Sequence, residues 1–436
     1  MPDEIYLDHN ATAPLAPEVL EAMRPYLEGR HANPSCAHRQ GREAREGIEK
    51  ARRIISETYG CARDEVVFTG GGTESNNLAI KGAALANAER GKHIVIGGAE
   101  HPCVAEAARF LTRFGFEVSE AAVDETGQVT PEALAAALRD DTALVSVMLA
   151  QNVVGTINRI DELNEVVAGR RLVFHTDAAQ AVGKIPTSIP FLGADLVTIA
   201  AHKFYGPKGV GALIVRRRTA LEPLFHGAGH ERGLRSGTEN TPGIVGFGAA
   251  VELARRTMAE AGERMVALRD ALHLLLVEAL PGVLLNGHRL DRLPNTLNLS
   301  FLGTQGAQIA ERMPEIMVGT GPACHDRMGG LSPTFAAMGL SAERSTSSLR
   351  ITLGRGNTWD EVQYVAERVI DTVRALRQEA GWQAAGAPRD PGPRCPRCEQ
   401  PLALDTAGIA PRMHCSLAPE CRHEAYLAAP AGAGLA

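Results

Sequence analysis

Short apolar runs alternate with helix-like segments through roughly the first half of the chain. The apolar runs are rich in β-branched residues and cover residues 65–70, 93–98, 143–149, 171–177 and 194–200. Between them, residues 74–88 and 131–138 carry apolar positions at helical spacing. Buried strands separated by helices are typical of a mainly parallel sheet covered by helices. The pattern therefore predicts an α/β fold.

The pattern changes after about residue 248. A long helical stretch over 250–279 is followed by strand-like runs at 295–301 and 348–354 and by a last helix over 359–380. We expect a large domain over 1–249, with an N-terminal segment that can join the other domain, and a smaller α+β domain over 250–380. Residues 381–393 are rich in Gly, Pro and Ala and are expected to form a linker to a small module over 394–428.

Composition narrows the function classes. The net charge is −6, which gives no electrostatic footprint for nucleic acid or an anionic membrane. No apolar run reaches the roughly 18 residues of a membrane helix, and the acidic start has no basic region followed by an apolar run. The eight cysteines do not read as a disulfide framework. A reducing, cytoplasmic location is expected.

Candidate chemistry begins at "IAAHKFYGPKGVG", where a buried strand ends on His202 and Lys203 before a rigid loop. A lysine at such a place is either at a strand end that reaches solvent, or paired, neutral or covalently engaged. A second strand, "RLVFHTDAAQ", ends on Asp177, where open α/β sheets place ligands and where aspartate also commonly caps helices. A third, "FTGGGTESNN", leads through Gly72 and Thr73 into a helix.

These three features together favour pyridoxal phosphate. A glycine turn at a helix start binds phosphate, and the motif is neither a dinucleotide nor an ATP fingerprint. A lysine forms the Schiff base with this cofactor, and a carboxylate keeps the ring nitrogen protonated. We therefore predict Lys203 as the lysine that bonds to the cofactor.

With these residues in place, the chain resembles cysteine desulfurases of the NifS type, which are pyridoxal phosphate-dependent enzymes of the class V aminotransferase fold. The resemblance covers about residues 4–375. Its motifs are "YLDHNAT", "NPSCAHRQGREA", "GGTESNN", "AEHPCV", "HTDAAQAVGK", "AHKFYGPKGVG", "HERGLRSGTEN", "GGLSP" and "SLRITLGR". It implies fold type I of the pyridoxal phosphate enzymes, with a large mainly parallel sheet and a smaller α+β domain.

The resemblance also implies roles for individual residues. His101 matches a catalytic residue that stacks on the cofactor ring, and Arg350 matches the arginine that holds the substrate carboxylate. The remaining cofactor contacts are implied at Gly72, Thr73, Asn152, Asp177, Gln180 and His202, with Asn152 also near the substrate. Thr238 matches a phosphate ligand lent by the other subunit, which implies a homodimer.

Cys324 is the residue that distinguishes a desulfurase from its relatives. It lies in the Gly- and Pro-rich stretch 318–333 and matches the cysteine of the family's mobile loop. A cysteine near a turn is ordinarily a small buried hydrophobe, but this setting is wrong for a core. The matched cysteine accepts sulfur as a thiolate and carries it as a persulfide.

Several positions depart from the family pattern. Ala200 stands where a phosphate-binding serine is usual, which removes one hydrogen bond worth about 1–2 kcal/mol. Gln151-Asn152-Val153 replaces the common Asn-Asn-Glu. Cys36 replaces a usual serine and Cys103 lies two residues after His101, and both are expected to be passive. With these departures, activity on cysteine can be weaker or differently tuned than in the family, and selenocysteine is an alternative substrate.

The tail is a separate prediction. Cys395, Cys398, Cys415 and Cys421 form two pairs about twenty residues apart, as in a zinc ribbon, although the second pair has five intervening residues. His414 and His423 are possible substitute ligands. An unliganded reduced tail and a sulfur-relay role stay open. The tail has few apolar residues, so its folding is expected to depend on the metal.

The function expected from the sequence is conversion of L-cysteine to L-alanine, with the sulfur passed through a Cys324 persulfide to a protein acceptor. The alternatives are a selenocysteine lyase, a related pyridoxal phosphate-dependent lyase or aminotransferase, and a weakly active sulfur-delivery scaffold. The identity of the acceptor is open, from iron–sulfur assembly to tRNA thiolation or DNA modification. No direct contact with nucleic acid or membrane is expected.

Overall fold

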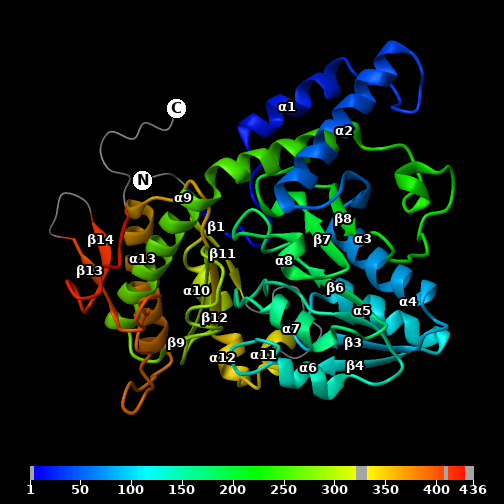
Figure 1. The fold of residues 1–436 in the computed structure, drawn as a ribbon. Coiled ribbons are helices and arrows are strands. Elements are labelled where there is room, and N and C mark those ends of the chain that lie inside the picture. Colours follow the sequence, from blue (N-terminus) through cyan, green and yellow to red (C-terminus); the bar gives the residue numbers. More distant parts are fainter. Residues whose placement is uncertain (1–3, 321–330, 407–410, 428–436) are drawn as a thin grey trace.

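A seven-stranded sheet forms the centre of the large domain (Figure 1). The computed structural model describes residues 4–320, 331–406 and 411–427. The strand order is β2 (Val66–Thr69), β8 (Gly211–Val215), β7 (Leu196–Ala200), β6 (Val173–Asp177), β5 (Thr142–Ser146), β3 (His93–Gly97) and β4 (Glu117–Ala121). Only β8 runs antiparallel to its neighbours, so the predicted mainly parallel α/β sheet is confirmed.

Helices cover both faces of this sheet, which explains why its strands read as continuous apolar runs. Alternate strand residues point to opposite faces, so Val197 and Ile199 belong to one core cluster and Leu196 to another. The large domain's helices are α1 (Pro17–Glu28), α2 (Arg39–Tyr59), α3 (Gly72–Asn77), α4 (Ala83–Ala86), α5 (Pro102–Leu111), α6 (Pro131–Ala137), α7 (Ile160–Val167) and α8 (Ile189–Leu192). A π-helical turn, η2 (Leu78–Gly82), joins α3 to α4 within the helix predicted over 74–88.

A five-stranded sheet forms the smaller domain. Its order is β1 (Ile5–Leu7), β11 (Ile316–Thr320), β12 (Ser348–Thr352), β10 (Thr296–Phe301) and β9 (Val283–Leu285). Only the β1–β11 pair is parallel. The N-terminal strand thus pairs with a segment more than 300 residues later, beside helices α10 (Gly306–Glu311), α11 (Pro333–Ala337), α12 (Ala342–Thr346) and α13 (Trp359–Glu379).

One long helix, α9 (Thr241–Ala279), connects the two domains (Figure 1). Phe247 and Val251 in its first half pack in the core of the large sheet. Leu268 and Leu272 in its second half pack in the core of the small sheet. The domain boundary expected at 249/250 therefore falls inside a continuous helix.

The tail forms a three-stranded antiparallel sheet, β13 (Leu402–Asp405), β14 (Arg412–Cys415) and β15 (Glu424–Tyr426), which contacts α9. Its buried side chains Leu402, Met413 and Leu427 belong to the core cluster of the small domain. The segment over 381–393 is also docked, since Gly282 N–H donates to the Pro388 carbonyl at 3.1 Å. The tail therefore gains its apolar burial from the small domain rather than from a core of its own.

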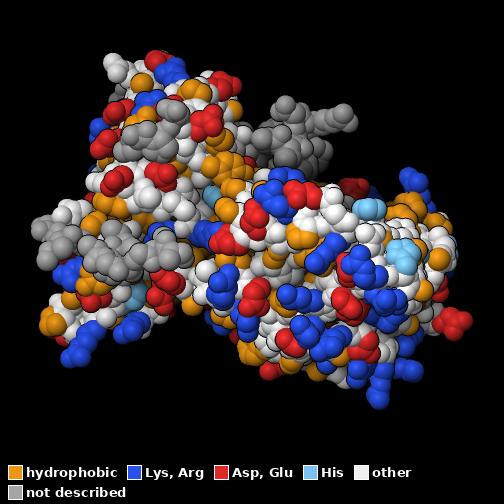
Figure 2. All heavy atoms as spheres, turned by 90° about the horizontal axis from the view of Figure 1, so that it is seen from above, with side chains coloured by type: hydrophobic (Ala, Val, Ile, Leu, Met, Phe, Trp, Pro, Cys, Tyr) orange, Lys and Arg blue, Asp and Glu red, His pale blue; other side chains and the backbone are white. Residues whose placement is uncertain are grey.

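On the face that Figure 2 shows, acidic and basic side chains are interspersed, so neither charge dominates it. Among the residues that the structure describes, no helix combines the length and apolar character needed to span a bilayer.

Candidate active site

Lys203 ends the 3-10 turn η4 (Ala201–Lys203), directly after strand β7. Its Nζ donates to the carbonyl oxygens of Asn10 and Ala11, both at 2.8 Å. Burial is the main cause that lowers the pKa of Lys203 to about 8, and the nearby Arg350 guanidinium adds to it. An appreciable fraction of this amine is therefore unprotonated near neutral pH, as a nucleophilic lysine requires.

Asp177 ends β6, the strand beside β7, so its carboxylate lies at the same edge of the sheet as Lys203. It is 5% exposed and accepts hydrogen bonds from Asn76 Nδ2 at 2.6 Å and from the Ala179 amide at 2.9 Å. Within the described part of the chain, no basic side chain lies within ion-pair distance of it. A buried carboxylate with only neutral donors provides a place for a cationic group of a ligand.

The glycine turn predicted to hold phosphate joins β2 to α3. Gly71 has φ of +139°, in a region that side-chain-bearing residues rarely adopt, and a Cβ on Gly72 would lie 3.3 Å from the Ala200 Cβ. Ala200 therefore faces this turn, and a serine hydroxyl there would lie against it. The Gly70 amide is already engaged by Glu74 Oε2 at 2.9 Å, while Thr73 is exposed.

His202 precedes Lys203 and faces the N-terminal segment. Its Nδ1 lies 3.1 Å from Thr12 Oγ1. Burial, followed by the positive charge of Lys203, lowers the pKa of His202 to about 4, so its ring is neutral at pH 7. A neutral imidazole can still donate one hydrogen bond to an anion, as the predicted phosphate contact requires.

His101 caps the N-terminus of α5 and contacts the thiol that follows it. Its Nδ1 accepts from the Cys103 amide at 3.2 Å and lies 2.9 Å from Cys103 Sγ. Cys103 Sγ also lies 3.0 Å from Asn76 Nδ2, next to Asp177, and burial raises the pKa of the thiol to about 12. Cys103 is therefore a protonated neighbour of His101 rather than a nucleophile.

Arg350, on β12, reaches the same region from the small domain. Its Nη2 forms an ion pair with Asp8 Oδ1 at 2.6 Å, and its Nη1 donates to the Asn152 carbonyl at 3.3 Å. Among the residues that the structure describes, the buried Nε has no hydrogen-bond partner. A buried guanidinium N–H without a partner is costly, so this arginine retains a donor for a ligand carboxylate.

The two departures around Asn152 have a local explanation. Gln151 is buried, and its side-chain amide donates to Thr334 Oγ1 at 3.0 Å while its oxygen accepts from the amides of Val153 and Val154. The glutamine thus organises the turn that presents Asn152.

Gln180, another predicted cofactor contact, donates to the Asn10 carbonyl at 2.9 Å and accepts from Lys184 Nζ at 2.7 Å.

Sequence reasoning used the N-terminal segment only as a family motif and missed its part in the site. Besides Asp8 and the carbonyls of Asn10 and Ala11, this segment contributes the Asn10 side chain, which contacts Lys184, Asn295 and Thr296. The signal was the polar stretch "DHNAT" directly after the short apolar strand β1. Its pairing with β11 brings it between the two domains.

One predicted residue is not brought into this group, and another is not described by the structure. Thr238 is exposed on the loop between the turn η5 (His230–Gly233) and α9, and its part in a homodimer stays a prediction. Cys324 lies outside the described residues. The described chain ends before it at Thr320 and resumes at Leu331.

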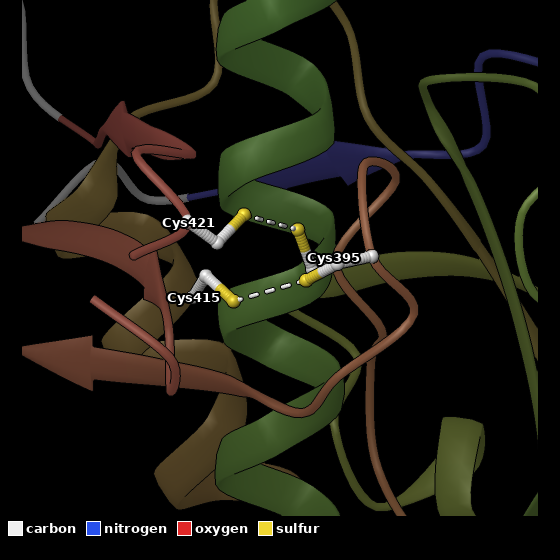
Figure 3. A group of neighbouring side chains, drawn as sticks. Cys395, Cys415 and Cys421 are labelled. Carbon is white, nitrogen blue, oxygen red and sulfur yellow. Dashed lines mark hydrogen bonds between the residues drawn. The ribbon is translucent and has the colours of Figure 1, made fainter. Parts of the chain in front are cut away.

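The four tail cysteines lie together, and Figure 3 shows three of their thiols pointing toward one another beside α9. The Sγ atoms of Cys395, Cys398, Cys415 and Cys421 all lie within 4.8 Å of one another. The pairs Cys395–Cys421 and Cys398–Cys415 are 3.7 and 3.5 Å apart. A tetrahedral zinc with Zn–S bonds of about 2.3 Å requires S···S separations of about 3.8 Å.

The histidines considered as substitute ligands have other contacts. The His414 ring faces the Cys415 carbonyl at 3.1 Å. The backbone carbonyl of His423 accepts from the Cys415 amide at 3.0 Å. Neither residue belongs to the four-thiol group. The thiols alone therefore supply a complete tetrahedral ligand set.

Comparison with known proteins gives consistent matches over the two domains. The "Aminotransferase class-V" family model matches residues 5–365. "Cysteine desulfurase IscS" of Dictyoglomus turgidum is 45% identical over 381 residues, covering 86% of this chain and 97% of that protein. Among solved structures, "NIFS-LIKE PROTEIN" has a TM-score of 0.81 at 35% identity, covering 85% of this chain and 100% of its own. "SspA in complex with cysteine" has a TM-score of 0.70 at 34% identity, covering 80% and 98%.

Proposed function

Since the chain belongs to the class-V aminotransferase family, and within it to the cysteine desulfurases, we propose that it converts L-cysteine to L-alanine and carries the sulfur as a persulfide on Cys324. The observation that carries this proposal is the position of Lys203 and Asp177 at the same edge of the sheet, at the ends of the neighbouring strands β7 and β6. The relative solved in complex with cysteine supports this substrate.

The residues at this edge of the sheet fit pyridoxal phosphate. Asp177 is a buried carboxylate without a cationic partner among the described residues, and the cofactor's protonated ring nitrogen supplies one. Lys203 is a half-buried amine whose pKa is lowered to about 8. The turn at Gly71 and Gly72 exposes backbone at the start of a helix, where a phosphate group is favourable. We infer that Thr73, His202 and Thr238 of a second subunit add to this phosphate site.

When bound, the cofactor withdraws electrons from the substrate's α-carbon, which makes its proton removable. We infer that Lys203 Nζ is the base for this step, because its lowered pKa lets it accept a proton and return it. His101 is held by its helix cap and by Cys103, so its ring keeps one orientation. We infer that Arg350 binds the substrate carboxylate through the Nε–H, which has no partner within 4–320, 331–406 and 411–427.

The sulfur transfer is balanced without an external oxidant. The Cys324 thiolate attacks the substrate sulfur, an S–S bond forms, and the C–S bond breaks. The electron pair of the broken bond stays with the carbon skeleton, which takes up a proton and leaves as alanine. One cysteine and one thiol thus give one alanine and one persulfide. A protein acceptor with a free thiol then takes the outer sulfur.

The four tail thiols are proposed to hold one structural zinc. The complete set of four thiols, the separations near the tetrahedral value and the position against α9 support this assignment. An open coordination position for catalysis would require a missing protein ligand, and four are present. The metal's proposed task is to keep the tail sheet folded on the small domain.

The test is to incubate the purified holoenzyme with L-cysteine and to follow alanine, sulfide and protein persulfide. Wild type is expected to give alanine and, with a reductant present, an equal amount of sulfide. Cys324→Ser is expected to bind cysteine with an altered absorption spectrum but to form no persulfide, because a hydroxyl is a far poorer sulfur acceptor. Equal alanine production by both proteins would contradict the desulfurase mechanism and favour a lyase. Selenocysteine as a parallel substrate separates the two lyase activities.

A further inference from the structure

Lys184 is a second buried lysine next to the site, and the mechanism above does not use it. It follows Gly183 in the segment after Asp177 and is 7% exposed. In the described part of the chain it has no acidic side chain within ion-pair distance. Burial, followed by the positive charges of Lys203 and Arg350, lowers the pKa of Lys184 well below its usual value. Burial thus favours the uncharged form of this amine, and a buried lysine is costly unless its hydrogen bonds are needed.

The hydrogen bonds of Lys184 go to two side-chain amides. Its Nζ donates to Asn10 Oδ1 at 2.9 Å and to Gln180 Oε1 at 2.7 Å. Because both amide oxygens face the amine, both NH2 groups must face away from it. The NH2 of Gln180 donates to the Asn10 carbonyl at 2.9 Å, and the NH2 of Asn10 donates to Thr296 Oγ1 at 2.9 Å.

The same Asn10 carbonyl accepts a hydrogen bond from Lys203. The distance from Lys203 Nζ to this oxygen is 2.8 Å, and the next carbonyl, of Ala11, lies at 2.8 Å as well. These two oxygens hold the lysine amine whenever it is free of other bonds. Their position depends on Asn10, and Asn10 is fixed from its other side by Lys184.

We propose that Lys184 is a positioning residue for Lys203: by fixing the amides of Asn10 and Gln180, it keeps the Asn10 carbonyl where it receives the Lys203 amine. The proposal rests on the proposed function, in which Lys203 carries the cofactor and moves protons. A free amine that is held in one place returns to the reacting carbon in the correct orientation, and misplacement by about 1 Å can cost up to about a hundredfold in rate.

The Lys184→Met variant tests this role with little change in packing. Methionine has a similar length and no polar hydrogen, so it fills the space and removes both donated bonds. This matters because Lys184, Lys203, His9 and Asn295 line one small cavity of about 30 Å³, which a shorter side chain would enlarge. Asn10 keeps the bond from Asn295 Nδ2 at 3.1 Å, whereas Gln180 loses its donor. Lys208→Met is the matched control, since Lys208 is exposed on the loop after Lys203.

Two measurements are made on each protein. The first is the rate at which added pyridoxal phosphate bonds to Lys203 in cofactor-free protein, followed by absorbance. The second is kcat and KM for L-cysteine per bound cofactor. We expect Lys184→Met to slow both the attachment and kcat by about tenfold with KM nearly unchanged, and Lys208→Met to match wild type. Lys184→Gln keeps a neutral donor on a shorter side chain and should retain more of both rates. If the methionine variant does not fold, Lys184→Gln is compared with wild type in its place.

A purely structural role would give a different result. Lys184→Met would then melt at a lower temperature but attach the cofactor and turn over per bound cofactor like wild type, which would overturn the proposal. Failure of the proposed function is distinguishable from this outcome. Wild type that makes no alanine from cysteine would refute the desulfurase assignment, while the attachment rates would still show whether Lys184 positions Lys203.

Discussion

The active site and the tail metal site place their reactive side chains by opposite means. The active site gathers Asp8, Asp177, Lys203 and Arg350 from segments up to 342 residues apart, through two sheets and a buried polar network. The tail gathers four thiols from within 26 residues on a small hairpin-like sheet. The first arrangement depends on the whole core, whereas the second depends on its metal and on the surface against which it packs.

This difference predicts where each region fails. Breaking one group in the active site should abolish chemistry and leave the fold intact, because many other contacts hold the site. Breaking one ligand in the tail should unfold the tail and expose apolar surface of the small domain, because few other contacts hold it.

Lys203→Ala should abolish alanine production and the absorption band expected at about 400–430 nm for cofactor joined to a lysine. Its thermal unfolding should stay close to that of wild type, since burial of an amine is not a source of stability. Lys208→Ala is the control. Borohydride reduction of wild type followed by peptide mass spectrometry should place the cofactor on Lys203. Attachment at Lys184 instead would contradict the assignment.

Cys415→Ser should lose the bound zinc, about one per chain by elemental analysis. The tail would then release Leu402, Met413 and Leu427 from the core of the small domain. With each buried apolar side chain worth about 1.5–3 kcal/mol, the free energy of unfolding should fall by about 5 kcal/mol or more. Cys36→Ser, away from the cluster, should keep both zinc and stability. Wild-type zinc content in Cys415→Ser would refute the four-thiol site.

Asp390→Asn tests how the segment before the tail is docked. Asp390 is nearly fully buried, its Oδ2 pairs with Arg289 Nη2 at 2.7 Å, and its Oδ1 lies 3.2 Å from His273 Nε2. Although burial opposes ionisation, these two partners lower the pKa of Asp390. We expect a loss of about 2 kcal/mol in the free energy of unfolding, measured by denaturant titration.

The pH dependence of that loss has a definite sign. A lowered carboxyl pKa stabilises the fold above the unfolded-state value of about 4, and this stabilisation disappears as the pH falls below it. The difference between wild type and Asp390→Asn should therefore shrink below about pH 4. Asp291→Asn, which breaks a more exposed pair with Arg159, should cost less than about 1 kcal/mol. Equal losses in the two variants would show that the docked segment adds little.

Ala200→Ser should have the smallest effect. The added hydroxyl faces the glycine turn and supplies one more hydrogen bond to a phosphate there. Cofactor release should slow by about fivefold, equivalent to about 1 kcal/mol, with kcat unchanged. Release can be followed by the decay of absorbance after dilution into a cofactor trap. An unchanged rate would mean that this place in the phosphate site is already filled.

The element types and the chemical identity of the site could be predicted from residue types and their order alone. Short continuous apolar runs rich in β-branched residues are typical of strands buried on both faces, and a lysine, an aspartate and a glycine turn at three strand ends indicated one cofactor. The four cysteines could also be recognised as metal ligands from the sequence, because they lie close together along the chain.

The surroundings of these groups could not be predicted in the same way. Nothing in the spacing of Asp8 and Asn10 shows that they meet Arg350 and Lys203, since those contacts depend on the parallel pairing of β1 with β11. The docking of the tail was equally hidden, because its few apolar residues read as too small a core until α9 supplied the rest. Local chemistry can be read from residue types, whereas burial and pairing between distant segments follow from how the complete core packs.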